Sequence, residues 1–354
     1  MNAIRTSHNP FDPLAYDLFD RMGFLVLDEF FDVWTGHKYS QPGDYATYFN
    51  TWHTTDLTDI VKQHRNHPSI VFYSIGNEIR DALATRTPLA TAMVSLCHTL
   101  DPTRPVTQAL FQPANNNDYP GNTLNVLDVF GVNYRNLELA AAIALTPHHS
   151  GVQTEKGTSP GEWASIYLAN PQIVGEFLWT GPDYLGEANG LWPQIGGTSG
   201  IIDRVSTIKD MGYQYQAIWS SNPVSRPTTT TTGATRVVLS VDHPTISTNG
   251  NDVAYVKATV MNAAGAIVTS ASNAVTFSLT GTTGKIIALD SGNPNQESYR
   301  GTSRNAYQGI CFAIVRMTSA GTVTITASAT GLTGSSVTVT GNNAPFVPCS
   351  GNCD

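Results

Sequence analysis

The sequence is poor in charged residues, and this shortage limits the classes of protein it can encode. Only 13% of the 354 residues are Asp, Glu, Lys or Arg, whereas a soluble domain usually has about 25%. The 19 basic residues are outnumbered by 27 acidic ones, so the net charge is −8. This composition excludes a coiled coil, a polyampholyte tail and a basic nucleic-acid-binding protein.

Long apolar runs and a leader pattern are also lacking. The longest apolar run covers residues 139–145, far short of the ~20 residues that a membrane-spanning helix needs, so we expect a soluble protein without a membrane partner. No basic segment followed by an apolar stretch opens the chain. Residues 2–5 already have the character of a strand, and a chain that begins within a strand is expected to be a fragment.

Cysteine is scarce, with four residues in all. Cys97 and Cys311 are isolated, whereas Cys349 and Cys353 lie four positions apart in a tail rich in Gly, Pro and Asn. A disulfide in the tail is one of two open readings, and a metal site is disfavoured because no histidine lies nearby. The cysteines therefore leave the redox compartment undecided.

The charge is unevenly distributed, which indicates two regions of different character. Six basic and five acidic residues follow Gly233, so this part carries +1 and the part before it carries −9. Residues 227–233 contain five consecutive threonines after a proline, the composition of a linker. The sequence predicts a domain over residues 1–225, a linker over 226–234, a second domain over 235–341 and a tail over 342–354.

The first region alternates short apolar strands with helical patterns, as repeated βα units do. Seven such units in about 225 residues favour an eight-stranded (β/α) barrel that lacks its first unit, since a complete barrel takes about 250 residues. A doubly wound sheet is the alternative. The barrel is preferred because polar residues follow strand after strand, and a barrel brings those strand ends to one face. The strands are expected at 3–6, 24–28, 70–75, 106–110, 129–133, 151–154 and 173–179, and the helices at 13–22, 45–64 and 88–100.

The second region predicts an antiparallel sandwich of immunoglobulin-like character. Short alternating strands are separated by Asn-Gly, Ala-Gly and Thr-Gly turns, which suit hairpins. The expected strands cover residues 237–241, 253–260, 275–279, 322–327 and 336–340.

Two glutamates stand out as candidates for chemistry. A nearly all-apolar strand ends abruptly in Gly76-Asn77-Glu78, and a carboxylate at the mouth of a buried strand is costly unless it has a use. Taken alone, Glu78 reads more readily as a residue that interacts with a helix dipole. Of three later candidates, Glu176 lies deeper in its strand and Glu187 lies in a loop, whereas Glu155 follows a strand end. Two carboxylates facing each other over a sugar are the requirement for glycoside hydrolysis.

Four motifs occur in order along the first region: residues 2–10 (NAIRTSHNP), 20–29 (DRMGFLVLDE), 65–78 (RNHPS leading into GNE) and 177–187 (FLWTGPDYLGE). With this spacing the chain resembles the C-terminal portion of glycoside hydrolase family 2, most closely its β-galactosidase-like members. Residues 290–309 resemble the immunoglobulin-like domain near the C-terminus of the same enzymes. Family members carry further domains before the barrel, so the resemblance also implies that this sequence is part of a longer enzyme.

The resemblance implies a role for seven residues. Glu78 matches the general acid/base and Glu155 the nucleophile of a retaining double displacement, although Gln153 stands where the family pattern has glycine. By themselves Trp179 and Tyr134 are more often core residues. Asp28 and Glu29 read as structural residues at the barrel mouth and stay outside the catalytic set. The expected sugar-binding residues are Asn77 for the 2-hydroxyl, His8 for the sugar, Tyr134 and Arg5 beside the nucleophile, and Trp179 as an aromatic platform.

The expected substrate is a terminal β-D-galactoside. A β-glucuronidase, a β-mannosidase and a catalytically impaired carbohydrate-binding or adhesion protein are the alternatives; a neutral sugar is preferred because no Asn-x-Lys is present to bind a uronic carboxylate. The sequence calls for no cofactor or metal and no nucleic-acid partner, and a cation is not indicated. The threonine linker, the low charge and the tail cysteines favour a secreted enzyme whose signal peptide belongs to a preceding segment.

Overall fold

The computed structural model describes residues 1–38, 43–116, 118, 123–146, 149–157, 160–188 and 190–343. Contacts between residues divide the chain into two compact units, and the division falls between Thr180 and Gly181. By their contacts, residues 181–225 belong to the second unit. The two units are described separately below.

The first unit is built on a parallel sheet whose seven strands follow one another in chain order. All seven predicted strands are confirmed. The three central ones are buried almost throughout, as expected for parallel strands covered on both faces. The strands are β1 (Ala3–Arg5), β2 (Leu25–Glu29), β3 (Ile70–Asn77), β4 (Val106–Leu110), β5 (Val129–Asn133), β6 (Ser150–Lys156) and β7 (Ile173–Leu178).

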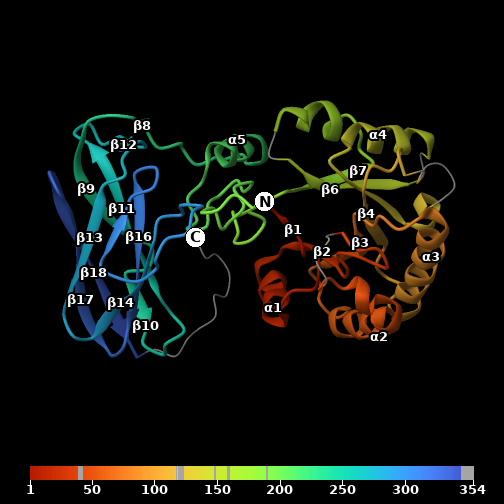
Figure 1. The fold of residues 1–354 in the computed structure, drawn as a ribbon, viewed down its shortest axis with the longest axis horizontal. Helices are drawn as coiled ribbons and strands as arrows, with labels where there is room; N and C mark the ends of the chain where they lie inside the picture. Colours follow the sequence, from red (N-terminus) through yellow and green to blue (C-terminus); the bar gives the residue numbers. More distant parts are fainter. Residues whose placement is uncertain are drawn as a thin grey trace. The chain divides into compact units, whose positions relative to one another are not determined.

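Helices connect these strands and lie around the outside of the sheet (Figure 1). They are α1 (Pro13–Met22), α2 (Ala46–His64), α3 (Leu83–Leu100) and α4 (Asn136–Leu145), with the short helices η1 (Thr123–Val126), η2 (Pro160–Glu162) and the π-helical η3 (Trp163–Leu168). Helix α1 begins where predicted, because the Asp12 side chain accepts a hydrogen bond from the Leu14 amide and Pro13 occupies the first turn. The predicted start of α3 at Pro88 was wrong: the helix begins at Leu83 and contains the proline.

The sheet is strongly curled rather than flat. Neighbouring strands lie about 4.8 Å apart, so β1 and β6 would be separated by about 24 Å in a flat sheet. Instead, Arg5 Nη1 at the end of β1 lies 2.7 Å from Glu155 Oε1 near the end of β6. The strands therefore form most of a barrel, and their carboxyl ends meet at one rim. This confirms the predicted (β/α) barrel with one unit fewer than eight.

The second unit contains two sheets with a common core. One sheet has the order β14–β16–β11–β9 and the other β18–β17–β13–β15, and a parallel pairing of β18 with β9 joins them. Val256 and Val315 of the first sheet share a buried cluster with Phe277 and Ile325 of the second, so the predicted sandwich is confirmed. The strands are β9 (Ala234–Val241), β11 (Ala254–Asn262), β13 (Ala274–Thr280), β14 (Gly284–Asp290), β15 (Ser303–Asn305), β16 (Ile310–Met317), β17 (Gly321–Ala329) and β18 (Leu332–Asn342), with the short β8 (Thr229–Thr230), β10 (Thr245–Ser247) and β12 (Ile267–Val268) and the helix α5 (Asp210–Trp219).

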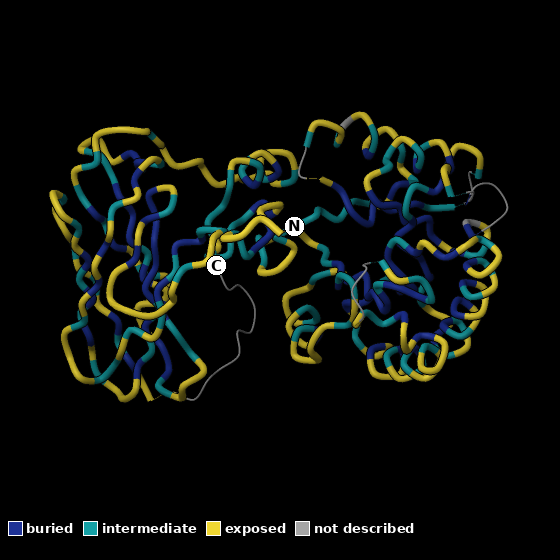
Figure 2. The backbone as a smooth tube through the Cα atoms, viewed as in Figure 1, coloured by how far each residue is buried: buried dark blue, intermediate teal, exposed yellow. Residues whose placement is uncertain are grey.

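Burial follows the pattern that each sheet type requires (Figure 2). In β17, every second side chain from Val323 to Ala327 is buried, as expected for a strand with one face in the core. The strand β16 was not predicted; its first four residues are all buried, so the alternation that marks a half-buried strand is missing there.

Part of the threonine-rich segment is ordered. Strand β8 pairs in parallel with β12, and the Ile267 amide donates to the Thr228 carbonyl at 2.9 Å. These threonines therefore lie along the sandwich, while the limits of the predicted linker stay a prediction. Cys97 and Cys311 are buried free thiols, and burial raises the pKa of each to about 12; the pairing of Cys349 with Cys353 falls outside the described residues.

Among the described helices, none combines the length and the apolar character needed to cross a membrane.

Candidate active site

Arg5 is the centre of a polar network at the rim of the barrel. Its guanidinium lies at the end of β1 and is almost fully buried. Nη1 donates to Glu155 Oε1 at 2.7 Å, and Nη2 donates to Glu29 Oε1 at 2.7 Å and to Asn77 Oδ1 at 2.9 Å. One side chain thus connects β1, β2, β3 and β6, which are far apart in the sequence.

Glu155 is held from several sides. Strand β6 continues through Lys156, so Glu155 lies within the strand and its side chain is only 7% exposed. The Gln153 side chain donates to the Glu155 carbonyl at 3.1 Å, and the Tyr134 amide donates to the same oxygen at 2.7 Å. The glutamine that replaces the expected glycine therefore supports the backbone of Glu155.

Glu78 directly follows β3 and is linked to Glu155 through a chain of polar side chains. Asn133 Nδ2 is 3.3 Å from Glu78 Oε1 and 3.1 Å from Asn77 Oδ1, and Asn77 in turn accepts from Arg5. The Glu78 side chain is 17% exposed, with Arg80 Nη2 at 3.7 Å. The two glutamates are therefore connected through two asparagines and one arginine at the same rim.

The Gly-Asn-Glu turn requires its glycine. A Cβ atom on Gly76 would lie 2.7 Å from Nε1 of Trp34. Real Cβ atoms essentially never come this close to another atom. Trp34 is fully buried and donates to the Ile75 carbonyl at 2.9 Å. Trp34 is thus a core residue that packs under the turn carrying Glu78.

The charged side chains at the rim stabilise one another through direct ion pairs. Burial alone raises the pKa of Glu29, but the Arg5 charge and the hydrogen bond with His8 outweigh it and lower the pKa to about 2. Burial lowers the pKa of Arg5, and the two carboxylates Glu29 and Glu155 reverse this and raise it. Burial and the nearby negative charge of Glu155 raise the pKa of Tyr134, so its hydroxyl stays protonated.

His8 and Trp179 complete the site. Their rings stack with centroids 5.0 Å apart and planes 5° from parallel. His8 Nδ1 is 2.8 Å from Glu29 Oε1, and Nε2 is 3.6 Å from Glu155 Oε1. The aromatic ring that follows β7 is therefore packed on the histidine that follows β1.

The structure brings all seven predicted site residues to one rim, and it adds Glu29 and Asn133. Glu29 was interpreted from the sequence as structural. Its position at the end of β2, like that of the other polar residues at the ends of their strands, was the signal that could have identified it as a site residue. Asn133 likewise ends β5. Their catalytic and binding roles stay predictions.

The two rejected glutamates have other partners. Glu176 has a fully buried side chain, with Lys156 Nζ at 3.9 Å, and burial raises its pKa although Tyr167 and the Lys156 charge act in the opposite direction. Glu187 belongs to the second unit, where it accepts from the Tyr184 hydroxyl.

The described ranges hold no group of three or more His, Cys, Asp and Glu side chains arranged to bind a metal ion.

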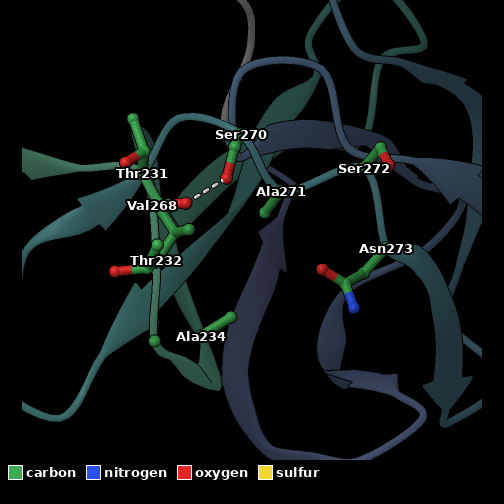
Figure 3. A pocket seen from close by; sticks show the side chains of 9 residues that line it. Thr231, Thr232, Ala234, Val268, Ser270, Ala271, Ser272 and Asn273 are labelled. Carbon is green, nitrogen blue, oxygen red and sulfur yellow. Dashed lines mark hydrogen bonds between the residues drawn. The ribbon is translucent and has the colours of Figure 1, made fainter.

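A separate hollow occurs in the second unit (Figure 3). It is lined by small and hydroxyl-bearing side chains such as Thr231, Ser270 and Asn273, and its lining has no titratable group. Acid–base chemistry is therefore not supported there.

A (β/α) barrel with two glutamates and an arginine at the carboxyl ends of its strands has the site of a glycoside hydrolase. Comparison with known families agrees. The family model "Glycosyl hydrolases family 2, TIM barrel domain" matches residues 1–157, and "Glycoside hydrolase family 2 C-terminal domain 5" matches residues 237–338. The chain belongs to glycoside hydrolase family 2.

Curated relatives include proteins named as a beta-galactosidase and as a putative beta-glucuronidase. Beta-galactosidase BoGH2A of Bacteroides ovatus is 26% identical over 89% of this chain, which covers 54% of that protein. A putative beta-glucuronidase of Formosa agariphila is 30% identical over 63% of this chain and 26% of its own length. The chain thus spans about half the length of the first relative and about a quarter of the length of the second.

Solved structures share the fold over nearly the whole chain. A glycosyl hydrolase family 2 member from Bacteroides cellulosilyticus has a TM-score of 0.83 and 23% identity, covering 97% of this chain and 58% of its own. A beta-glycosidase from Bacteroides vulgatus has a TM-score of 0.79 and 24% identity, covering 96% and 59%. At this identity the likeness concerns the fold.

Proposed function

We propose that the chain is the catalytic portion of a retaining glycosidase that cleaves terminal β-D-galactosides. The observation that carries this proposal is the pair of glutamates at one rim, of which one is bound to a buried arginine and the other is partly exposed. An ionised carboxylate beside Arg5 suits a nucleophile, whereas a carboxyl that can reach solvent and the leaving group suits a proton donor.

The reaction proceeds in two displacements. A Glu155 carboxylate oxygen attacks the anomeric carbon while the Glu78 carboxyl gives its proton to the departing glycosidic oxygen, so the C–O bond to the aglycone breaks as the glycosyl–enzyme ester forms. Glu78, now a carboxylate, then takes a proton from water as the water oxygen attacks the same carbon and frees Glu155. Two inversions return the β-configuration.

A neutral sugar is supported by the charges at the rim. Arg5 is already paired with Glu29 and Glu155, so its charge is not available for a uronic carboxylate. The relative that aligns with 89% of this chain is named a beta-galactosidase. Galactose is therefore proposed over glucuronic acid and mannose.

The test is hydrolysis of nitrophenyl β-galactoside, β-glucuronide and β-mannoside by the purified chain. We expect turnover of the galactoside, a large loss in Glu78→Gln and Glu155→Gln, and near-normal turnover in Glu176→Gln, which alters a buried glutamate with no recorded contact to Arg5, Glu78 or Glu155. Greater turnover of the glucuronide or mannoside would refute the sugar assignment. A folded chain that hydrolyses none of them would refute the activity and favour a carbohydrate-binding role.

Azide tests the two roles separately. In Glu155→Ala, azide can attack the anomeric carbon from the vacated face and expel nitrophenolate, giving an α-galactosyl azide. In Glu78→Ala, Glu155 still forms the ester with this good leaving group, and azide then displaces Glu155 to give the β-azide. The reverse pattern of products would contradict the assignment.

A further inference from the structure

Glu29 is a buried carboxylate at the rim to which the proposed reaction assigns no step. From its contacts we infer that Glu29 is a positioning residue, which orients Arg5 and His8 toward Glu155. The inference rests on the proposed function, because it concerns the same site.

The Glu29 carboxylate is fixed on all sides. Its side chain has no solvent exposure. Oε1 accepts from Arg5 Nη2 at 2.7 Å and contacts His8 Nδ1 at 2.8 Å, while Oε2 accepts from Arg5 Nε at 3.1 Å and from Ser74 Oγ at 2.8 Å. The Glu29 amide also donates to the Thr6 hydroxyl at 2.8 Å. A carboxylate held in this way is a rigid support for its partners.

The first consequence concerns how Arg5 meets Glu155. Because Nε and Nη2 of Arg5 face Glu29, only Nη1 donates to Glu155, and the same nitrogen also donates to the Thr154 carbonyl at 3.0 Å. Without Glu29 the guanidinium is free to turn and form a two-bond fork with Glu155, as arginine prefers with carboxylates. A fork would occupy both oxygens of the nucleophile and stabilise the anion too well to attack.

The second consequence concerns the tautomer of His8. His8 Nδ1 lies 2.8 Å from Glu29 Oε1 and 3.3 Å from the donor Arg5 Nη2. A carboxylate with a low pKa only accepts hydrogen bonds, and the contact with Glu29 is the shorter one, so we assign the proton to Nδ1. In the neutral ring Nε2 is then an acceptor, and it faces the region of Glu155 at 3.6 Å while the ring stacks on Trp179. This orientation offers a sugar hydroxyl an acceptor beside the nucleophile.

The kinetic test uses Glu29→Gln, which keeps the shape and removes the charge. We expect kcat on nitrophenyl β-galactoside to fall at least tenfold. The acid limb of the kcat/KM profile should move down by about one pH unit, because the negative charge on Glu29, which shares the Arg5 guanidinium with Glu155, is lost. The charged and titratable groups that face Glu155 are otherwise retained in this variant; they are Arg5, His8, Tyr134 and Glu78.

Two further variants separate the effect of the Glu29 charge from the effect of its side-chain length. Glu29→Asp keeps the charge on a shorter side chain, so we expect kcat to fall while the acid limb stays in place. Glu176→Gln is the matched control, because it also replaces a glutamate with a fully buried side chain, and we expect it to change neither quantity. If Glu29→Gln does not fold, Glu29→Asp and Ser74→Ala carry the test, and unchanged kcat in both would overturn the inference.

A readout without turnover separates this inference from the proposed function. Nitrogen-15 NMR of the His8 ring should show the Nδ1–H tautomer in the wild type and a mixture of tautomers in Glu29→Gln. That result, in a chain without galactosidase activity, would refute the function and support the positioning role. An active chain in which Glu29→Gln leaves both the His8 tautomer and the acid limb unchanged would overturn the positioning role alone.

Discussion

Replacing Glu29 with Gln should make the stability of the first unit less dependent on pH. Glu29 has a pKa of about 2 in the folded protein against 4.5 ordinarily. A carboxyl whose pKa is lowered by folding contributes stability above its unfolded pKa, and this contribution disappears as the pH falls through its folded pKa. The difference corresponds to about 3 kcal/mol at neutral pH.

The measurement is urea unfolding followed by tryptophan fluorescence at a series of pH values between 7 and 2. We expect Glu29→Gln to be about 3 kcal/mol less stable than the wild type at pH 7. The difference should shrink from pH 4.5 toward pH 2, where Glu29 itself becomes neutral. Comparing the two proteins at each pH cancels the contributions of other carboxyls such as Asp101, whose pKa is also lowered, to about 2.

Glu176→Gln provides the opposite case. Burial raises the pKa of Glu176 in the folded protein, so its ionisation opposes folding as the pH rises through the unfolded pKa. The free energy of unfolding of Glu176→Gln, relative to that of the wild type, should therefore be higher at pH 7 than at pH 2.

A stability difference between Glu29→Gln and the wild type that stays constant from pH 7 to pH 2 would refute the charge balance assigned to Arg5 and Glu29.

Three other substitutions test separate parts of the structure. Gly76→Ala should destabilise the first unit by about 1–3 kcal/mol, because the added carbon collides with Trp34; an unchanged unfolding midpoint would contradict the packing. Tyr134→Phe should lower kcat on a nitrophenyl galactoside roughly 10- to 100-fold because the protonated hydroxyl beside Glu155 is lost, and a normal kcat would argue against a role for that hydroxyl. Phe277→Ala should cost the sandwich about 3–5 kcal/mol, measured by thermal unfolding, while galactoside hydrolysis at low temperature persists.

The sequence determined the order and type of most elements. Apolar strands that alternate with helical patterns fixed seven parallel strands, and alternating strands with Gly-containing turns fixed the sandwich, because these patterns depend on local periodicity. The position of Glu78 directly after its strand, and that of Glu155 near the end of its strand, also followed from the sequence, since a strand end is a local feature.

Only the tertiary structure decided which side chains share contacts. Arg5 and Glu155 are 150 positions apart, and their meeting depends on the curl of the sheet, which no local pattern records. The same holds for Glu29, which the sequence marks only as an acid at the end of a strand. Its place between Arg5 and His8 arises because side chains from several strand ends converge at the rim, where a buried carboxylate is stable only beside a buried cation.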